Sequence, residues 1–489
     1  MFVLVLLILV SVLYYWYFRR SRQSLYKFSE SLLTVGELPV LGHTHWFLGG
    51  PAKILDNIRT LTEKIEETGK VCRIWIGPTL YVVTFNLDDL QKILETCMEK
   101  DSSYKFLRPW LGNGLFVAPV ELWKSQRRQL LPVFSNRLIE DYIEAFGKHG
   151  DVLVRLLVKE VGKSRFDVYR YVTSCMLDVV FETAMGEEMN VQGNPDTPYL
   201  RARSTVMSII NMRLFKAWLQ PDALFHMTKH AASQKENIDV THKFTDEVIH
   251  KKKSVFDQSS HIDELEGKGN VKDILQILLE RKSFNTVELR EHIDSITIAG
   301  NDTTALVISY ALMLLGRYQE EQEKVYKELK DIFGDSKRLP TKEDLSRMDC
   351  LERAVKETMR LYTVVPLFAR KTQQELKLST CTIPAGVGCA FIPFVMHRSK
   401  KIWGEDANSF NPDRFLPENS KARHPCAYLP FSYGPRNCIG RHFGFLAMKS
   451  ILSNILRSYK ISSDGCDGLK IEILLFPVSG HLISLEKRT

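Results

Sequence analysis

A single cysteine in the stretch Phe431–Gly440 has the surroundings of a metal-binding thiolate. The ten residues read FSYGPRNCIG, with Cys438 in the eighth position. Gly434 and Gly440 lack a Cβ, so the backbone can pass close to a flat macrocycle, and Arg436 can neutralise a carboxylate of that macrocycle. A lone cysteine is often a buried free thiol instead. The pattern F-x-x-G-x-R-x-C-x-G favours an axial ligand of haem iron.

This stretch resembles the haem-binding loop of the cytochromes P-450, the haem-thiolate monooxygenases. By this resemblance Phe431, Gly434, Arg436, Cys438 and Gly440 bind the haem, and Cys438 is the iron ligand. The resemblance implies a mainly α-helical fold with small β-sheets in a single large domain. The implied cofactor is haem, iron protoporphyrin IX.

A second unusual stretch, AGNDTT at residues 299–304, interrupts a long helical pattern. Gly and paired Thr are poor helix formers and a buried Asp is costly, so local stability is sacrificed there. A small residue at 300 lets a small ligand approach the backbone, and a Thr hydroxyl outside the i−4 ladder can open a groove for water. An acid beside an alcohol can relay protons to haem-bound dioxygen. We assign Asp302 to proton delivery and Thr303 to hydrogen-bonding of the dioxygen; a kinked helix with a salt-bridged Asp is the alternative.

The AGNDTT stretch resembles the oxygen-activation signature of the same family, with Ala299 and Gly300 next to the haem. In many fatty-acid ω-hydroxylases of the family a Glu precedes this Gly and can esterify the haem. Ala299 occupies that place in this chain. The resemblance therefore implies a non-covalently bound haem, and ω-regiochemistry loses one support.

Three further residues are candidates for binding the haem propionates. Trp123 and Arg127 match the family's W-x-x-x-R pattern, in which an indole N–H and a guanidinium bind carboxylates. Arg370 lies at the end of a loop that the family uses for haem and substrate contact. Exposed surface arginines are the alternative for each.

Opposite charges at Glu357 and Arg360 lie at positions i and i+3 of a helical pattern. Such pairs are common on solvated surfaces. By the family resemblance they instead form an internal ion-pair network with Arg414, which is structural and not catalytic. Removing one partner would leave a buried charge unpaired.

The sequence carries no flavin or nicotinamide fingerprint, so electrons must come from a separate protein. The resemblance implies a membrane-bound NADPH-dependent flavoprotein reductase and allows a microsomal b-type cytochrome as a second donor. A basic rim around the haem loop could receive an acidic donor, although scattered solvated charges explain these residues nearly as well. The rim would consist of Lys124, Arg128, Arg441 and Lys449.

Composition favours one globular domain. The chain has 489 residues, of which 44% are hydrophobic and 25% are charged, without a low-complexity linker or repeat. The net charge of +8 is spread along the chain, which argues against nucleic acid as a partner. Nine cysteines without paired spacing fit a reducing compartment and no disulfide framework.

The first 18 residues contain no charged side chain and are followed by Arg19, Arg20 and Arg22. This pattern predicts an uncleaved membrane anchor at 1–18, a basic linker and hinge at 19–45 and the catalytic domain at 46–489. The positive-inside rule places the catalytic domain on the cytosolic side of the endoplasmic reticulum membrane. A cleaved signal peptide and a buried N-terminal helix are the alternatives.

The elements that must position these residues are mainly helical between residues 87 and 374. The longest helix is predicted at about 286–315, followed by a helix that ends near Gly334. Breaks are predicted near 112–119, 193–198 and 251–269. A β-hairpin is predicted at 71–85, and strand-rich segments at 376–390 and 469–485.

Apolar residues in several segments could form a substrate wall, or could simply be core packing. Residues 106–116, with Trp110 and Leu115, resemble the W-L-G-x-G-L segment of the fatty-acid hydroxylase clan. Residues 209–225 would form part of a lid. Further wall candidates are Val364, Val365, Leu367 and Phe476.

These features together predict a microsomal monooxygenase that inserts one atom of O₂ into a lipophilic small molecule: a fatty acid, a hormone or a xenobiotic. A reductase-independent peroxide isomerase or dehydratase of the same fold is the first alternative. Such enzymes often lose the acid–alcohol pair, so Asp302 and Thr303 argue against it. A non-catalytic haem-binding protein is the second alternative.

Overall fold

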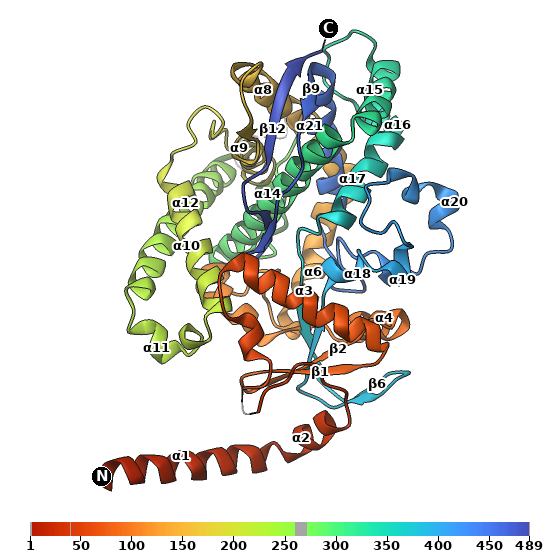
Figure 1. Cartoon of the computed structure of the whole chain (residues 1–489). Coiled ribbons are helices and arrows are strands. Elements are labelled where there is room, and N and C mark those ends of the chain that lie inside the picture. Colours follow the sequence, from red (N-terminus) through yellow and green to blue (C-terminus); the bar gives the residue numbers. More distant parts are fainter. Residues whose placement is uncertain (1, 40, 260–270, 489) are drawn as a thin grey trace.

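The part of the chain that the structure describes is mainly helical, with four small β-sheets (Figure 1). The structure, a computed structural model, describes residues 2–39, 41–259 and 271–488. The longer helices are α1 (Phe2–Ser21), α2 (Gln23–Glu30), α3 (Pro51–Thr68), α4 (Leu87–Thr96), α6 (Val120–Leu130), α8 (Ile143–Leu157), α9 (Tyr169–Val180), α10 (Pro198–Phe215), α12 (Lys229–Ser259), α13 (Ile274–Arg281), α14 (Thr286–Arg317), α15 (Gln319–Phe333), α17 (Asp349–Leu361) and α21 (Arg441–Ser458). Short helices include α5 (Arg108–Leu111), α7 (Asn136–Glu140), α11 (Asp222–His226), α16 (Lys342–Arg347), α18 (Pro393–Met396), α19 (Lys400–Trp403) and α20 (Pro417–Ser420).

Helix α14 runs through the middle of the molecule, and α9, α12, α17 and α21 pack around it (Figure 1). It begins at a capping box, in which the Asn285 side chain accepts from the Glu288 N–H and the Glu288 carboxylate accepts from the Asn285 N–H. Its second half, from Thr304 to Gly316, is buried without interruption. The predicted helix at 286–315 is confirmed, since α14 extends from Thr286 to Arg317.

The largest sheet has the strand order β1-β2-β8-β5-β3. Strands β1 (Cys72–Ile76) and β2 (Thr79–Val83) form the predicted hairpin, with Ile74 opposite Tyr81. The other strands are β3 (Glu99–Lys100), β5 (Phe368–Lys371) and β8 (Gly388–Phe391). The sheet thereby places Lys100 beside Arg370, although the two are 270 positions apart in the chain.

Both predicted strand-rich segments contain strands. In the first, β6 (Leu376–Lys377) pairs with β7 (Thr382–Ile383). In the second, β10 (Leu469–Ile471) pairs with β11 (Leu475–Pro477), and β12 (Leu482–Lys487) lies between β4 (Phe166–Asp167) and β9 (Tyr459–Ser462). The predicted end of a helix near Gly334 is also confirmed, since α15 ends at Phe333 and Gly334 has φ 59°.

One predicted break is wrong in its first half. Helix α12 continues to Ser259, so residues 251–259 are helical; the rest of that predicted break, 260–269, lies outside the described residues. The run of lysines at 251–253 is compatible with a solvent-facing helix, and Lys251 and Lys252 bind Glu187 and Asp273. A high density of charged residues was therefore not sufficient to predict a connection between helices.

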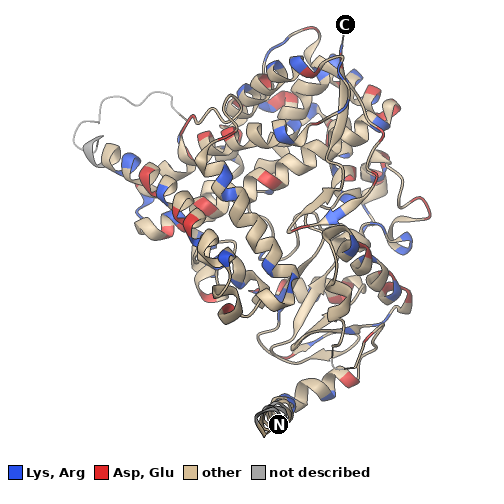
Figure 2. Ribbon diagram, turned by 60° about the vertical axis from the view of Figure 1, so that its left-hand side comes forward, with Lys and Arg blue, Asp and Glu red and all other residues tan. Residues whose placement is uncertain are grey.

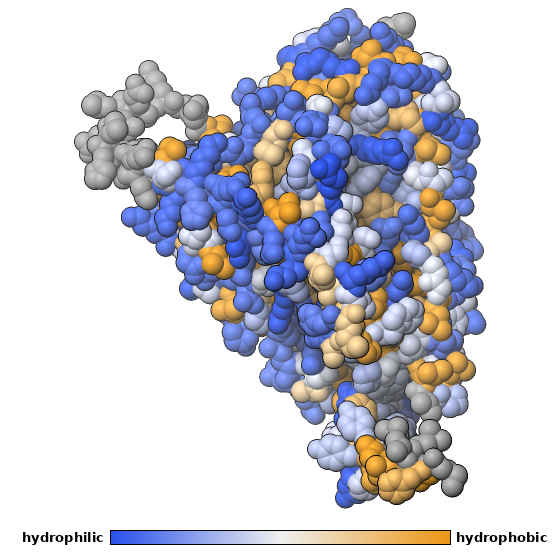
Figure 3. Space-filling view, turned by 90° about the vertical axis from the view of Figure 1, so that its left-hand side faces the viewer, coloured by the Kyte–Doolittle hydropathy of each residue, from blue (hydrophilic) through white to orange (hydrophobic). Residues whose placement is uncertain are grey.

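The N-terminal segment is helical as far as Glu30. Helix α1 projects from the body at the lower edge in Figure 1, and Figure 3 shows apolar side chains on it. Residues 23–45, predicted as linker and hinge, lie against the hairpin: Arg73 Nη1 donates to the carbonyls of Ser29 and Leu32, at 2.6 and 3.0 Å. One described helix is long and apolar enough to cross a membrane, and it is α14, which is mostly buried inside the protein.

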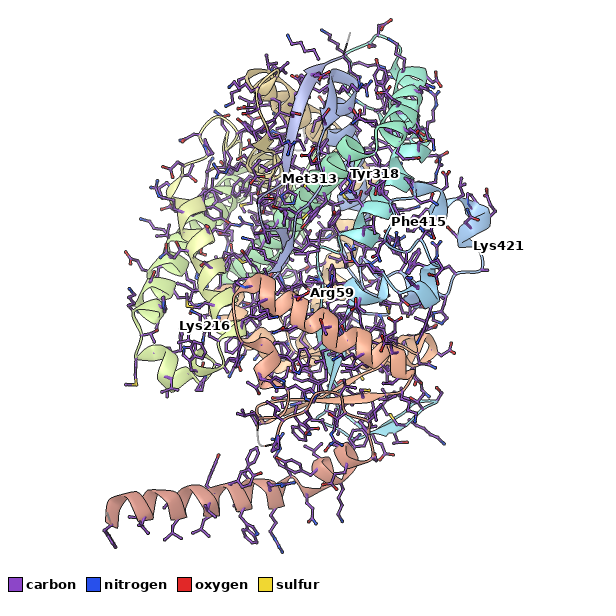
Figure 4. The ribbon with its side chains drawn as sticks, viewed as in Figure 1. Arg59, Lys216, Met313, Tyr318, Phe415 and Lys421 are labelled. Atoms are coloured by element: carbon purple, nitrogen blue, oxygen red, sulfur yellow. The ribbon has the colours of Figure 1, made fainter. Side chains whose placement is uncertain are left out.

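The largest core cluster lies around α14 and joins α8, α9, α17 and α21. Figure 4 labels Met313 on α14 inside this core, and Arg59 and Lys216 at the outside. Charged residues are scattered over the outer helices (Figure 2). The interior between α14 and the largest sheet is where the candidate residues meet.

Candidate functional site

Cys438 lies on the loop directly before α21. Its backbone N–H donates to the Phe431 carbonyl at 2.9 Å, which closes the loop into a tight turn. The Cys438 side chain is solvent-accessible. Although the side chain is accessible, the protein atoms packed around the sulfur partly desolvate it and raise the pKa of the Cys438 thiol, while the Gly440 backbone and the cations Arg127, Arg441 and Lys100 act in the opposite direction. Cations near the sulfur favour its thiolate form, as an iron ligand requires.

The two loop glycines, Gly434 and Gly440, differ in what surrounds them. Gly434 has φ 75°, and a Cβ there would lie 2.4 Å from the Leu94 carbonyl oxygen of α4. The left-handed backbone and the close approach of the loop to α4 therefore both favour glycine at position 434. A Cβ on Gly440 would lie 4.0 Å from the Cys438 sulfur, which is an ordinary van der Waals distance.

Helix α14 presents a narrow accessible stripe in its otherwise buried middle. Ile296, Ala299, Gly300 and Thr303 follow one another at helical spacing; Ala299 is exposed and the others are half-buried. Gly444 of α21 packs beside Thr304, since a Cβ on Gly444 would lie 3.9 Å from the Thr304 hydroxyl. The start of α21, and with it the Cys438 loop, thus lies next to this stripe. Gly300 also allows α14 to pack closely against α9, because a Cβ at this position would lie 3.3 Å from the Val180 side chain.

Asp302 and Thr303 lie next to each other on α14 but make separate contacts. The Thr303 hydroxyl donates to the Ala299 carbonyl at 2.7 Å and so keeps the i−4 bond that the sequence suggested it would leave. The buried Asp302 carboxylate forms an ion pair with Arg203 of α10 at 2.5 Å and accepts from Asn301 at 3.0 Å and Tyr169 at 3.5 Å. Among the described residues no hydrogen bond joins Asp302 to Thr303.

Three cations meet near the Cys438 loop without a carboxylate. Arg370 and Arg436 are 2% and 6% exposed, and Lys100 faces the rings of Tyr104 and Phe116 at 4.3 and 4.6 Å. Within residues 2–39, 41–259 and 271–488, none of the three is in ion-pair distance of an acid, and Nε and Nη1 of Arg370 and Nε of Arg436 have no partner. Buried guanidinium nitrogens without acceptors require an anionic ligand. The two propionates of a haem fit this requirement.

The pKa values of this cluster reflect its unpaired charge. Burial lowers the pKa of Arg370, and burial next to Arg370 lowers the pKa of Arg436 to about 10. Burial and the two neighbouring guanidiniums hold the pKa of Lys100 well below its ordinary range. Sequence reasoning missed Lys100, since its only signal is the pairing of β3 with β5.

The two W-x-x-x-R residues lie on α6, beside the Cys438 loop. The Trp123 ring has the guanidiniums of Arg127 and Arg436 over it at 5.7 and 4.9 Å. Arg127 donates to the carbonyl and side-chain oxygens of Asn437, at 2.8 and 2.5 Å, and Arg436 donates to the carbonyls of Met98 and Ala118. Phe431, the last loop candidate, packs 5.4 Å from the ring of Phe445.

Comparison with known proteins agrees with this geometry. Residues 34–481 match the protein family described as Cytochrome P450. The chain belongs to the cytochrome P450 family. It is 34% identical over 466 residues to human Cytochrome P450 4V2, covering 92% of this chain and 88% of the relative, and 33% identical over 492 residues to Cytochrome P450 4c3 of Drosophila melanogaster, covering 96% and 92%.

A solved structure has the same fold. The crystal structure of the haem domain of cytochrome P450DA superposes with a TM-score of 0.81, at 22% identity, over 94% of this chain and 98% of that one. This likeness shows the fold. As a member of the cytochrome P450 family the protein is an enzyme, a monooxygenase, and it binds haem non-covalently.

In this cytochrome P450, Glu357, Arg360 and Arg414 lie together in the core. Arg360 and Glu357 are fully buried and joined by two hydrogen bonds, of 2.7 and 2.6 Å, and Arg360 also donates to the carbonyls of His397, Ala407 and Ser409. Arg414 lies 3.5 Å from the Glu357 carboxylate. The network fastens α17 to the segment that leads into the Cys438 loop, which agrees with a structural role.

Of the four residues of the expected basic rim, three are exposed. Lys124 and Arg128 on α6 and Arg441 at the start of α21 face solvent. Lys449 does not belong to the rim: it is 5% exposed and pairs with Glu352 of α17 at 2.8 Å. Its place on the buried face of α21 explains the difference.

The expected substrate wall is divided among several clusters. Phe106, Trp110 and Leu111 pack with Val206 and Ile210 of α10 and with Ile298 of α14, while Leu115 packs against the main core. Phe476 packs edge-on against Tyr169 at 5.7 Å, and Leu367 joins the cluster under α3. Val364 is buried and Val365 is 36% exposed. The 209–225 segment contains the end of α10, the 3₁₀ turn Ala217–Leu219 and α11.

Proposed function

We propose that this cytochrome P450 is a membrane-anchored monooxygenase that oxidises a lipophilic small molecule with electrons from an NADPH-dependent flavoprotein reductase. The observation that carries the proposal is the accessible stripe on α14, where Ala299 and Thr303 interrupt a buried helix beside the ion-paired Asp302. An apolar substrate and a proton donor can both reach this stripe. A peroxide isomerase has no need for the acid.

The haem, when bound, supplies oxygen activation and oxygen transfer. Cys438 would hold the iron as a thiolate, which Arg127, Arg441 and Lys100 favour. Arg370 and Arg436, with Lys100, would hold the propionates. The loop and the cation cluster are therefore assigned to binding and orientation, and not to chemistry.

Proton delivery is assigned to the pair on α14. Asp302 holds its carboxylate between Arg203 and Asn301, away from the Thr303 hydroxyl. A proton on the carboxylate can reach Thr303 Oγ1 after the side chain turns from Arg203, or through a bridging water. Thr303 Oγ1 can give up its bond to the Ala299 carbonyl and donate toward the accessible stripe.

Membrane attachment is assigned to residues 1–18, with 19–45 as a basic linker and hinge and 46–489 as the catalytic domain. Support comes from the exposed apolar side chains of α1, among them Leu9, Leu13 and Trp16, and from Arg19 and Arg20 in its last turn. Aromatic and basic residues together favour the cytosolic membrane interface. We place the enzyme in the endoplasmic reticulum membrane with the catalytic domain in the cytosol.

The substrate is assigned to the lipophilic class: a fatty acid, a hormone or a xenobiotic. The apolar cluster at Phe106, Trp110 and Leu111 supports this class. A microsomal b-type cytochrome is proposed as an additional electron donor, and Lys124, Arg128 and Arg441 are the exposed cations that would meet an acidic donor.

The decisive test is the absorption spectrum of the reduced protein with carbon monoxide. The wild type is expected to give the red-shifted Soret band of thiolate ligation, and Cys438→His is expected to lose it. Cys350→His, which changes a half-exposed cysteine elsewhere, should keep the band. NADPH-driven O₂ consumption with a flavoprotein reductase then tests the monooxygenase; a wild type with a histidine-like band, or without O₂ uptake, would contradict the proposal.

A further inference from the structure

The turn from Trp110 to Leu115 is held by side chains of two other helices. His242 of α12 donates from Nε2 to the Trp110 carbonyl at 2.7 Å. The Leu115 N–H donates to Nδ1 of His292 on α14 at 3.3 Å. The turn thus receives contacts at both of its ends.

The middle of the turn packs on Glu291 of α14. Gly112 has φ 53° and ψ −126°, and a Cβ there would lie 1.8 Å from a Glu291 carboxylate oxygen. A Cβ on Gly114 would lie 2.3 Å from the Glu291 carbonyl oxygen. Burial raises the pKa of Glu291, while the Asn113 backbone acts in the opposite direction through a hydrogen bond to the carboxylate. The two glycines are therefore explained by the close approach of this turn to α14.

The two histidines that contact the turn are neutral: His292 accepts a hydrogen bond and His242 donates one. His292 is fully buried, and burial lowers its pKa to about 4, so Nδ1 can accept while Nε2 carries the proton. Burial likewise lowers the pKa of His242, which lies 3.8 Å from Asp294. On the other side of the turn, Gln126 of α6 donates to the Asn113 carbonyl at 3.0 Å.

The turn carries part of the apolar wall assigned above to the substrate. Trp110 and Leu111 are 2% and 1% exposed and pack with Val206 of α10 and Ile238 of α12. Displacement of the turn from α14 would displace these two side chains together. The contacts of the backbone therefore determine where the wall lies.

We propose that Glu291, His292 and His242 are positioning residues that hold the Trp110–Leu115 turn against α14 and so set the shape of the apolar wall that a lipophilic substrate meets. This inference rests on the proposed function for the nature of the ligand. It assigns no chemical step to the three residues, since their contacts are to the backbone of the turn.

Hydrogen–deuterium exchange of the haem-loaded full chain tests the contact itself. Glu291→Ala and His292→Ala are each expected to speed exchange of the amides at 112–115 by about tenfold. Glu291→Gln and His292→Asn keep an acceptor for the same N–H groups and are expected to restore slow exchange. Glu280→Ala removes a half-buried glutamate of the neighbouring α13 that forms an ion pair with Lys272. This variant should leave the exchange rates of the amides at 112–115 unchanged.

Two iron-binding azoles then test the effect on the wall. Imidazole has no apolar tail, whereas 1-dodecylimidazole carries a long one. The two alanine variants should raise the dissociation constant of 1-dodecylimidazole by about tenfold and change that of imidazole by less than about twofold. His242→Ala should act in the same direction, and the Gln and Asn variants should restore binding.

The outcomes separate the two proposals. Unchanged amide exchange in both alanine variants would overturn the positioning role, and so would faster exchange with unchanged 1-dodecylimidazole binding. Neither measurement needs a reductase or an oxidisable substrate. Failure of the wild type to consume O₂ with NADPH and reductase would therefore overturn the proposed function alone.

Discussion

At the scale of single residues, the site is marked by buried charge that the protein itself does not pair. Arg370 is almost fully buried, two of its nitrogens have no partner among the described residues, and it lies close enough to Arg436 and Lys100 to lower the pKa values of both. Unpaired buried cations destabilise a fold. The cluster therefore makes the folded state depend on an anionic ligand, which links haem binding to stability.

Arg370→Met tests this dependence. The apoprotein is expected to become more stable by about 1–3 kcal/mol, because an unsatisfied buried charge is removed. The haem is expected to dissociate about ten times faster, because a charge-assisted bond to a propionate is lost. Urea unfolding of the apoprotein and haem transfer to excess apomyoglobin measure the two effects. Arg59→Met, on the outside of α3 (Figure 4), is the control, and destabilised apo-Arg370→Met would contradict the assignment.

Glu357 shows the opposite situation, a buried charge whose partners are all present. Glu357→Ala leaves the Arg360 guanidinium without its carboxylate in a fully buried place and is expected to cost about 3–5 kcal/mol. Urea unfolding and haem content measure the loss. Glu405→Ala, at an exposed pair with Lys400, should be close to neutral. A Glu357→Gln protein that folds and keeps its haem normally would argue against the network.

At the scale of elements, the Cys438 loop is shaped by its contact with α4. Gly434→Ala is expected to cost about 1–3 kcal/mol for the left-handed backbone and to displace the loop further, because the new Cβ would meet the Leu94 carbonyl oxygen. Gly386→Ala also has a positive φ, of 87°, but meets nothing within 4 Å. Haem content should fall in the Gly434 variant and not in the Gly386 variant; equal haem content would contradict the role of the α4 contact.

Local patterns predicted those elements whose periodicity is set by burial, and missed contacts between distant segments. The hairpin at 72–83, the long α14 and the end of α15 follow directly from alternation, helical spacing and Gly334. Lys100 needed the pairing of β3 with β5, and the partner of Asp302 is Arg203, about a hundred positions away on α10. No spacing rule connects such residues, since only the tertiary fold brings them together. The same limit applies to Lys449, whose burial on α21 depends on the packing of α17.

At the scale of the whole molecule, burial lowers the pKa values of several histidines in the described interior, and for His292, His397 and His481 it lowers them to about 4 or below. His397 accepts from the Leu429 N–H at 2.8 Å and interacts with Thr363 at 2.9 Å, which ties α17 to the approach of the Cys438 loop. Burial lowers the pKa of His397 and of His481 to about 3, and that of His292 to about 4. Asp294 has the opposite effect on stability at low pH, because burial raises the pKa of its carboxyl group to about 8 and the folded state therefore binds its proton first. The buried histidines make the folded state sensitive to acid, and Asp294 opposes that effect.

The direction of the pH effect follows from where protons bind. An unfolded histidine takes up a proton below pH about 6.5, whereas folded His481 does so only near pH 3, so the unfolding free energy falls as pH is lowered between these values. Each histidine contributes a slope of about 1.4 kcal/mol per pH unit in that window.

His481→Asn removes one titrating group and should reduce the slope between pH 4.5 and 6.5 by about this amount, as measured by urea unfolding at several pH values. His226→Asn makes the same change on the surface and is the control. An unchanged slope in the His481 variant would mean that His481 takes up its proton without unfolding, and that its burial does not keep it neutral.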